Sequence, residues 1–484
     1  MADCGNPAAE QDALMKRRTK YDKTRQCIKC REKLGNVVIR HAVFCRECFF
    51  PTVITKFKRV LEPSISGSRS KRGLKASGNL CLAFSGGLGS TVLLDLISTV
   101  YFSTDGHDWS RGKGGGTNHP RNEPVWNKAT VCYVEVCSAI PGARDRTEEV
   151  RAAAARYACF ATFVPLRLED AFDDEWWAKV GGRPAQSRFS VDLGNEDLFL
   201  SPNPKSTPTA ALKSYLSSLP TQTAVPAAIQ NLIRILLLHT ARATGSSHLL
   251  LGTSLTSLSI SLISSISQGS GFVVRDEASE SWRPEGDRSG SDAVIQVARP
   301  LREIAMKETT MWAWWRGLSV VGKENYLGGK QGIGALTKAF IIGLERDYPS
   351  TVSTIARTCG KLAPKDASDT RCVLCERPAQ PGVQAWKERI SIRERSSLTQ
   401  SQTQTQTQTQ VTQIPPGLTP HLCYACHTTL TSRSSRGSTA AADVHTTPLP
   451  VWVDAKLEER SQRRRVGQAE MKAAIADFLL PDED

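Results

Sequence analysis

The sequence NLCLAFSGGLGSTVLLDLIS, residues 79–98, joins an apolar run to a glycine-rich turn and then to a second apolar segment. The run 80–84 is typical of a buried strand, and the apolar residues after the turn have the spacing of a helix face. A strand, a glycine turn and a helix N-terminus together present backbone N–H groups to a phosphate. The turn 85–90 contains no charged side chain. The sequence therefore predicts the frame of a nucleotide site without the side chain that would hold a metal.

The segments after this turn alternate between strand-like and helix-like patterns. Strands are predicted at 128–136, 159–166, 247–252 and 293–301, and helices at 145–158, 227–245 and 302–315. The segment 253–270 fits either pattern, and its place between two strands favours a helix. This alternation predicts an α/β fold with a doubly wound parallel sheet, in which ligands bind at the carboxyl ends of the strands. The turn 85–90 follows the first such end.

The composition indicates a soluble intracellular protein with an anionic partner. The 484 residues suggest roughly two to four domains, and 62 Lys and Arg against 48 Asp and Glu leave a net charge of +14. This balance suggests nucleic acid as the partner, although a basic enzyme can have the same charge. The basic clusters are 16–20, 56–59, 69–72 and 463–465. The polar N-terminus does not resemble a secretory signal, and no apolar run reaches the roughly 18 residues that would cross a membrane.

Two cysteine pairs near the N-terminus have the spacing of a zinc site. Cys27 and Cys30 are separated by two residues, as are Cys45 and Cys48, and fourteen residues lie between the pairs. Four thiolates arranged in this way make a closed tetrahedral site, which is structural rather than catalytic. The intervening NVVIRHAVF is typical of strands. We therefore predict an N-terminal zinc ribbon at 25–60.

A second set of cysteines near the C-terminus has the same pairing but a longer gap. It consists of Cys372, Cys375, Cys423 and Cys426, with forty-seven residues between the pairs. Much of the gap is a polar low-complexity tract at 397–416, which has too few apolar residues to pack. Without this insert, a second zinc-binding module at 365–430 is plausible. His421 and His427 could replace a ligand, but the two complete cysteine pairs make them unnecessary.

The chain has 14 cysteines, and in a reducing compartment they are expected to bind metal or to lie buried rather than to form disulfides. Outside the two sets, apolar surroundings are found for Cys81, Cys132, Cys137 and Cys159. Cys132 and Cys137 are five residues apart on one predicted strand, so they should face opposite ways and form no joint site. Burial is expected for both.

The turn SGGLGS at 85–90 resembles the PP-loop of the N-type ATP pyrophosphatases, which adenylate a substrate carbonyl and include the tRNA thiolases. The usual form of that loop is SGGxDS, and Gly89 stands at the position of its aspartate. The segments 299–308 and 340–362 also resemble parts of tRNA thiolation enzymes. The resemblance covers nearly all of the chain outside the inserts, and it implies the PP-loop type of α/β domain at 76–320.

Two absences indicate a relative that has lost catalysis. Active members have a His-Asn-x-Asp-Asp pattern after the strand at 247–252, where this chain has TSLTS. Active thiolases also have central cysteines that hold sulfur or an iron–sulfur cluster, and none occurs here between Cys159 and Cys359. Chemistry on the phosphates of ATP needs a bound metal. The positions that lack a metal-binding acid are Gly89, Thr256 and Ser257.

On these residues the chain resembles the cytoplasmic tRNA 2-thiolation protein 2 family, the partner subunit of the wobble-uridine thiolase. The resemblance implies a cytoplasmic heterodimer, without a membrane, in which a catalytic PP-loop thiolase subunit uses ATP. It also implies tRNA for Lys, Glu and Gln as substrates and a thiocarboxylated ubiquitin-like protein as sulfur carrier. No catalytic residue is expected in this chain. Residual nucleotide binding is open for Ser85, Gly86, Gly87 and Ser90.

Two other functions stay open. A self-sufficient ATP-dependent tRNA-modifying enzyme would need other acids for magnesium, and Asp95 and Glu135 are the nearest in the sequence. A solvated helix face explains Asp95 equally well. The other alternative is a zinc-ribbon adaptor for nucleic acid or a ubiquitin-like protein, with no enzymatic role.

The predicted domain order follows from these motifs. It runs from a disordered basic N-terminus at 1–24 and the ribbon at 25–60 to the α/β domain at 76–320, which has loop inserts near 102–127 and 183–222. A helical extension at 321–364, the cysteine module at 365–430 and a C-terminal tail with a terminal helix at 431–484 complete the chain.

Overall fold

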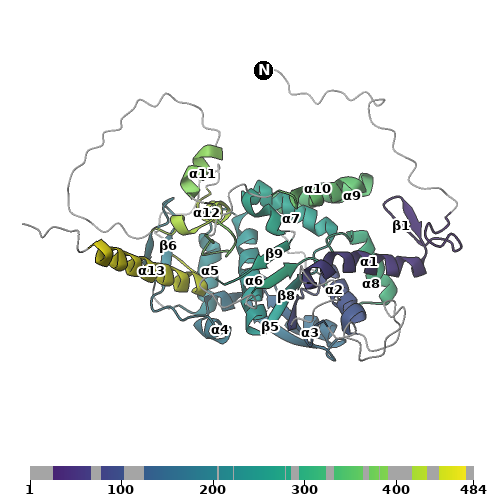
Figure 1. Ribbon diagram of the computed structural model, residues 1–484, viewed down its shortest axis with the longest axis horizontal. Coiled ribbons are helices and arrows are strands. Elements are labelled where there is room, and N and C mark those ends of the chain that lie inside the picture. Colours follow the sequence, from purple (N-terminus) through teal and green to yellow (C-terminus); the bar gives the residue numbers. More distant parts are fainter. Residues whose placement is uncertain are drawn as a thin grey trace, which may run out of the picture.

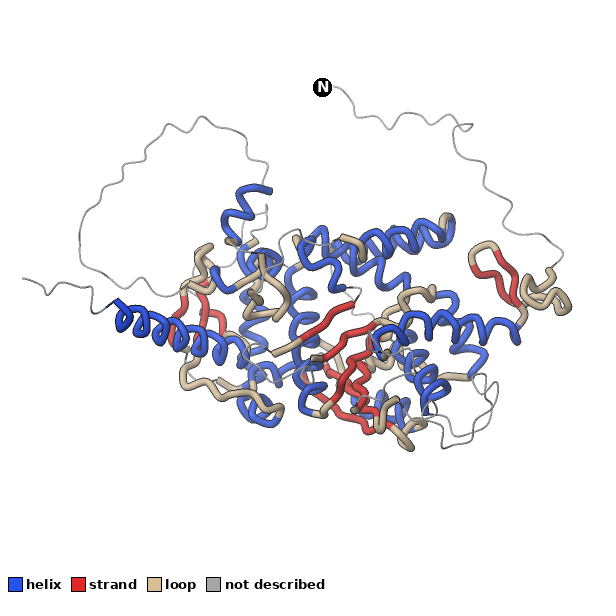
Figure 2. The backbone as a smooth tube through the Cα atoms, in the orientation of Figure 1, coloured by secondary structure: helices blue, strands red, loops and turns tan. Residues whose placement is uncertain are grey.

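The computed structural model contains a central six-stranded sheet with helices on both faces and a smaller sheet at one end (Figures 1 and 2). It describes residues 25–66, 78–102, 125–203, 206–221, 223–277, 279–284, 294–322, 332–362, 370–380, 382–390, 417–432 and 446–475. The basic clusters predicted at 16–20 and 69–72, and the low-complexity tract at 397–416, lie outside these residues.

The strands form three sheets. Their bounds are β1 (Val37–Ile39), β2 (Ala42–Phe44), β3 (Asn79–Ala83), β4 (Ala129–Glu135), β5 (Ala161–Arg167), β6 (Phe189–Asp192), β7 (Leu200–Pro202), β8 (Ser246–Leu251), β9 (Ser279–Trp282), β10 (Ile295–Ala298) and β11 (Thr446–Pro448). The central sheet has the order β5-β4-β3-β8-β10-β9. All its pairings are parallel except that of β9 with β10 at the edge, which is antiparallel and was not anticipated from the sequence.

The helices connect and cover these strands. The α-helices are α1 (Arg46–Ile65), α2 (Leu88–Ile97), α3 (Thr147–Ala155), α4 (Asp174–Lys179), α5 (Pro208–Ser218), α6 (Ala224–Ala243), α7 (Leu255–Ser267), α8 (Met306–Arg316), α9 (Ile333–Asp347), α10 (Pro349–Cys359), α11 (Val383–Ile390), α12 (Tyr424–Thr431) and α13 (Val451–Ile475). Short 3-10 helices are η3 (Cys137–Ala139), η4 (Leu168–Phe172), η5 (Ser270–Glu277) and η7 (Thr419–His421), and the π-helix η1 (Ser98–Phe102) extends α2.

Apolar side chains alternate between the two faces of the central sheet because successive residues of a strand point in opposite directions. On β3, Leu80 and Leu82 pack in one core together with α1, α2 and α8. Cys81, between them, packs in the other core with α5 and α6. Both faces are therefore covered, and the predicted doubly wound, mainly parallel sheet is confirmed.

The strand order reverses between β3 and β8, and this reversal places the turn 85–90 where parallel sheets bind ligands. The chain moves outward from β3 to β4 and β5, and then returns to β8 on the other side of β3. The carboxyl ends of β3 and β8 therefore lie side by side with no connection crossing between them. The segment 253–270, whose sequence fits either a strand or a helix, forms the helix α7. Ser254 caps this helix, because its hydroxyl accepts a hydrogen bond from the backbone N–H of Ser257.

Two segments contain more regular structure than the sequence predicted, because distant parts of the chain form a common sheet. The segment 183–222, predicted as a loop insert, contains β6, β7 and α5. The segment 431–484, predicted as a tail with a terminal helix, contains the helix α13, in which Trp452 is fully buried, and also contributes β11, which pairs with β6. Figure 1 shows this C-terminal unit at the end of the molecule opposite to the hairpin β1–β2.

Among the described residues one helix, α6, is long and apolar enough to cross a membrane. Its side chains Leu232, Leu236 and Leu238 are buried against the central sheet and the C-terminal unit. A helix in the core of a folded domain can have the same length and apolar composition as a helix that crosses a membrane.

Candidate functional site

The turn 85–90 at the carboxyl end of β3 is held by hydrogen bonds among its own residues. The Ser90 hydroxyl donates to the Gly87 carbonyl at 3.0 Å and lies 3.3 Å from the Ser85 hydroxyl. The backbone N–H of Gly87 donates to the Ser85 hydroxyl at 3.4 Å. Gly86 has a φ of +68°, a left-handed conformation that favours glycine. The local pattern thus folds as predicted, into a tight turn before a helix.

The position of the missing aspartate is closed by backbone packing. A Cβ atom on Gly89 would lie 2.0 Å from the carbonyl oxygen of Gly252, which follows β8. A Cβ atom on Gly252 would in turn lie 2.4 Å from the backbone nitrogen of Ser90. The first turn of α2 and the end of β8 therefore touch backbone to backbone. Neither glycine can be replaced by a larger residue without movement of the main chain.

The segment after α8 closes over the turn from the other side. The backbone N–H groups of Val321 and Gly322 donate to the Gly86 carbonyl at 3.0 and 3.3 Å. The Arg146 guanidinium donates to the carbonyl oxygens of the same two residues at 2.9 and 3.2 Å. A Cβ atom on Gly86 would lie 3.1 Å from Cβ of Val321. The turn therefore acts as an internal packing element that joins α2, α3 and the end of α8.

Asp95, one of the two acids considered for magnesium, is a buried structural residue. Its carboxylate accepts hydrogen bonds from Trp312 Nε1 at 2.8 Å and from the Tyr157 hydroxyl at 3.1 Å, and it forms an ion pair with Arg316 at 3.1 Å. Only 1% of the residue is exposed, so a solvated helix face is the wrong interpretation. Burial, together with the negative charge of Asp95, raises the pKa of Tyr157. Asp95 thus joins α2 to α3 and α8.

Replacing Asp95 with asparagine should lower the free energy of unfolding by about 2 kcal/mol, because it removes a charge that a buried hydrogen-bond network and Arg316 require. Chemical denaturation would measure this change. Asp347→Asn, at an exposed position at the end of α9, is the matched control and should be neutral. Unchanged stability of the Asp95 variant would instead favour a role for this acid in metal binding.

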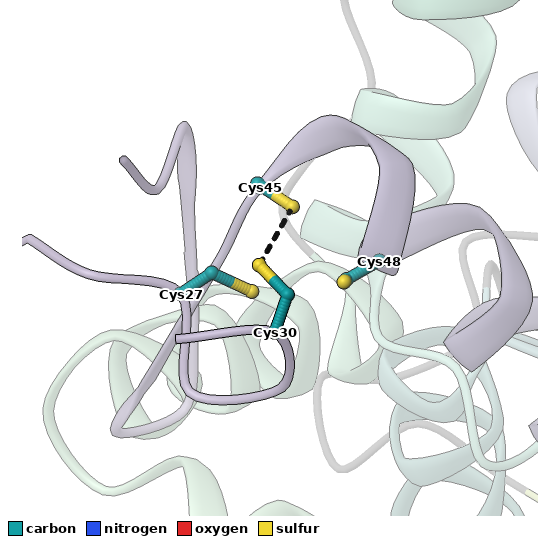
Figure 3. A group of neighbouring side chains, drawn as sticks. All are labelled: Cys27, Cys30, Cys45 and Cys48. Carbon is teal, nitrogen blue, oxygen red and sulfur yellow. Dashed lines mark hydrogen bonds between the residues drawn. The ribbon is translucent and has the colours of Figure 1, made fainter. Parts of the chain in front are cut away.

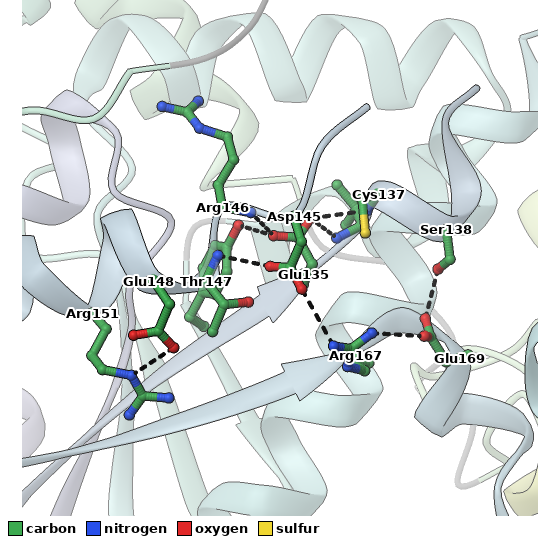
Figure 4. A network of polar contacts seen from close by, with 12 residues as sticks. Glu135, Cys137, Ser138, Asp145, Arg146, Thr147, Glu148, Arg151, Arg167 and Glu169 are labelled. Carbon is green, nitrogen blue, oxygen red and sulfur yellow. Dashed lines mark hydrogen bonds and ion pairs between the residues drawn. The ribbon is translucent and has the colours of Figure 1, made fainter. Parts of the chain in front are cut away.

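Glu135, the second candidate acid, is also fully engaged by its own chain (Figure 4). It accepts hydrogen bonds from the Tyr133 hydroxyl at 2.7 Å and from the backbone N–H groups of Val136, Cys137 and Arg146 at 2.8 to 2.9 Å. The residue is 4% exposed. Because its oxygens already have four donors, Glu135 fixes the end of β4 and the start of α3 rather than holding magnesium.

The resemblance to active PP-loop enzymes implies acids at positions 256 and 257, of which Thr256 lies against the helix α9 and Ser257 is exposed. The Thr256 hydroxyl donates to the Glu345 carboxylate at 2.7 Å and accepts from the backbone N–H of Met306 at 3.0 Å. Thr256 is fully buried. Among the residues that the structure describes, Glu345 is the acid that contacts Thr256. It lies 89 residues away in the sequence, so no local pattern could have indicated it.

The N-terminal cysteines form a compact group at the end of the hairpin β1–β2. The sulfur atoms of Cys27, Cys30, Cys45 and Cys48 all lie within 4.8 Å of one another and point toward a common centre (Figure 3). The distance from Cys30 to Cys45 is 3.9 Å, close to the ~3.8 Å edge of a zinc tetrahedron with ~2.3 Å bonds. Burial would raise the pKa of Cys27, but backbone N–H groups of Cys30, Cys45 and Lys29 lower it to about 6. The donor set fits a metal that prefers thiolates.

The C-terminal cysteines form a second such group despite the long gap between their pairs. Sulfur atoms of Cys372, Cys375, Cys423 and Cys426 lie within 4.8 Å of one another, and all four residues are buried. His421 and His427 are neighbours, as predicted. His427 Nε2 lies 3.0 Å from the Glu196 carbonyl, and His421 Nδ1 lies 3.2 Å from the Arg460 guanidinium.

The two cysteine groups have the same backbone architecture. In each group, a hydrogen-bonded turn surrounds the first cysteine pair. The hydrogen bonds that close this turn come from the backbone N–H of the first cysteine and from that of the residue four positions later. That later residue, Arg31 or Glu376, has a positive φ of 58° or 55°. The second pair lies at the N-terminus of a helix, α1 or α12, rather than in a second turn. Only the tertiary structure reveals this repeated arrangement, and the zinc ribbons stay a prediction.

The remaining cysteines agree only in part with the expected burial. Cys81 and Cys132 are fully buried on adjacent strands, with their sulfur atoms 3.6 Å apart. Cys137 lies beyond β4 in η3 and is half-buried, so it does not share a strand with Cys132. Cys159 is exposed.

Comparison with known proteins finds similar sequences that share one name. The family model Cytoplasmic tRNA 2-thiolation protein 2 matches residues 332–428. The Homo sapiens protein of that name is 26% identical over 547 residues, covering 100% of this chain and 98% of the relative. The Bos taurus protein of that name is 28% identical over 383 residues, covering 72% of this chain and 71% of the relative.

A solved structure, the U34-tRNA thiolase NcsA from Methanococcus maripaludis with its 4Fe-4S cluster, is similar at a TM-score of 0.44 and 15% identity, covering 69% of this chain and 86% of that one. A superposition at this level supports no functional conclusion. The sequence matches extend over the whole chain and share one name. The chain is therefore similar, along nearly its whole length, to proteins named cytoplasmic tRNA 2-thiolation protein 2.

Proposed function

We propose that this chain is the non-catalytic subunit of the cytoplasmic complex that 2-thiolates the wobble uridine of tRNA. The family supports the pathway, because its relatives are named for cytoplasmic tRNA 2-thiolation. The observation that carries the non-catalytic role is the contact between Gly89 and Gly252, which leaves no room for the PP-loop aspartate. Asp95 and Glu135, the nearest other acids, are used for packing.

The chemistry then belongs to a partner. A catalytic PP-loop subunit would bind ATP, adenylate C2 of the uridine in tRNA for Lys, Glu and Gln, and transfer sulfur from a thiocarboxylated ubiquitin-like carrier. This chain would contribute a folded surface, to which the turn 85–90 is joined through Arg146 and Val321. Residual nucleotide binding by Ser85, Gly86, Gly87 and Ser90 stays a prediction, in a turn whose hydroxyl groups already bond one another.

The two cysteine groups would each hold one structural zinc. Zinc is favoured over other metals because both sites offer four sulfur donors and no oxygen or nitrogen donor. With four protein ligands neither metal has an open position, so each would stabilise its module and take no part in sulfur transfer.

The proposal is tested by pyrophosphate release. The isolated chain, given ATP, magnesium and tRNA, should release no pyrophosphate above background, because the loop has no acid for the metal. A reconstituted pair with a catalytic PP-loop subunit should release pyrophosphate and form 2-thiouridine, which mass spectrometry of the tRNA would detect.

Two outcomes would support the other functions. Magnesium-dependent pyrophosphate release by the isolated chain would establish a self-sufficient enzyme. A catalytic subunit that thiolates tRNA equally well without this chain would leave a zinc-dependent adaptor as the better description.

A further inference from the structure

A large cleft separates the N-terminal hairpin and α1 from α7 and α10. Its volume is about 960 Å³, near the upper end of the ~300–1,000 Å³ typical of ligand sites. Leu255, after β8, and Arg302, after β10, lie in its wall. The cleft therefore opens at the carboxyl edge of the central sheet, on the side of β8 away from the turn 85–90.

We call this site the basic cleft because its charged lining residues are cations with one exception. The cationic residues are Arg40, Lys56, Arg59, Arg275, Arg302, Arg357 and Lys361, and the acidic residue is Glu303. They come from the hairpin β1–β2, α1, η5, the connection from β10 to α8, and the end of α10. Segments far apart in the sequence thus place positive charge around one cavity.

Part of this charge is balanced inside the protein and part is not. Arg59 forms an ion pair with Glu303, and Lys56 forms one with Glu308. Within the described part of the chain, no carboxylate lies within ion-pair distance of four other cations, and all four are exposed. These cations are Arg40, Arg275, Arg357 and Lys361. The basic cleft therefore presents a concentrated positive potential to solvent.

The rest of the lining suits a nucleotide chain. The hydroxyl groups of Thr52 and Ser281 donate hydrogen bonds within the protein, so their oxygens can accept from ribose. The half-buried Phe44 and the exposed Ile28 supply apolar surface for bases. Arg40 is at the tip of the hairpin with a φ of +56°, which is uncommon for arginine. The two-residue connection between β1 and β2 requires this conformation, and it holds Arg40 at the rim of the cleft.

We propose that the basic cleft binds the sugar–phosphate backbone of a single-stranded or looped RNA segment. The choice of tRNA as the RNA rests on the proposed function, whereas the cleft itself is inferred from its charge and lining. Spaced phosphates match the four cations that form no ion pair with any described residue. These cations come from the hairpin, η5 and the end of α10, and the net charge of +14 attracts the same ligand. An acidic protein segment is the competing ligand that the test must separate from RNA.

The test compares two triple variants of the full-length chain. Arg275→Gln, Arg357→Gln and Lys361→Gln remove charge from the basic cleft, and Lys179→Gln, Arg183→Gln and Lys213→Gln are the matched control. The control residues are exposed and lie in or beside α4 and α5, toward the opposite end of the molecule from the hairpin (Figure 1). Binding of a fluorescein-labelled tRNA Gln transcript would be measured by anisotropy at several salt concentrations, and circular dichroism would verify that all variants are folded.

The cleft variant should bind the transcript about tenfold more weakly, and the slope of log K against log salt should fall by about 2, since each lost contact to a single strand removes roughly 0.7. The control should match the unmodified chain. Polyuridylate should compete with the transcript far better than polyglutamate at equal charge.

Equal affinity and slope for the cleft variant would overturn the proposal. So would competition by polyglutamate as strong as that by polyuridylate, which would indicate an acidic protein ligand. Pyrophosphate release by the isolated chain would contradict the proposed function but would leave the binding result intact, so the two proposals fail separately.

Discussion

Gly89→Asp is expected to destabilise the protein by about 3 kcal/mol and to restore no pyrophosphate release. The new Cβ atom would overlap the carbonyl oxygen of Gly252, which is part of the main chain and cannot turn aside as a side chain could. The backbone between α2 and β8 would have to separate. Even a tolerated aspartate would find no second acid, because Thr256 and Ser257 stand where active relatives have two.

Thermal and urea unfolding would measure the stability change, and pyrophosphate release would measure activity. Gly343→Ala is the matched control, because Gly343 lies in the helix α9 with no atom near its Cβ position. That change should stabilise the helix by up to about 1 kcal/mol. A stable Gly89→Asp variant with magnesium-dependent activity would show that the turn is a dormant active site rather than a packing element.

Cys372→Ser is expected to remove one of two zinc ions and to unfold the C-terminal unit. Structural zinc in a four-cysteine site contributes on the order of 10 kcal/mol, which is comparable to the whole stability of a domain. The effect should spread because Glu376, buried beside this site, accepts hydrogen bonds from His239, Trp282 and Lys456. Burial would raise the pKa of Glu376, but the charges of Lys456 and His239 lower it well below its usual range.

Cys27→Ser should also release one zinc, with a more local consequence. The hairpin β1–β2 should unfold. The helix α1 should stay folded, because Phe49 and Phe57 are buried in the core that α1, α2 and α8 form on one face of the central sheet. Elemental analysis of anaerobically purified protein would count zinc, and limited proteolysis would locate the unfolding. Cys159→Ser, at an exposed cysteine outside both groups, is the control. Absence of zinc from the unmodified protein would contradict both predictions.

Local pattern alone determined the parallel strands of the central sheet, the turn 85–90 and the cysteine pairs. The apolar run before the turn and the glycines within it specify β3 and the start of α2, because buried strands and tight turns need those residue types at those positions. Cys27 and Cys30 likewise form a turn whose geometry depends on a few adjacent residues. Such features depend on neighbours in the sequence, so the sequence could predict them.

Contacts between distant segments decided what the sequence could not. Asp95 looked equally suited to solvent or to magnesium until the fold placed Trp312 and Arg316, more than two hundred residues away, against its carboxylate. The pairing of β11 with β6 and the collection of Arg40, Arg275 and Arg357 around one cleft have the same origin. A single residue gives no local signal of its distant partners, because those partners are selected by the packing of the whole chain rather than by the periodicity of any one segment.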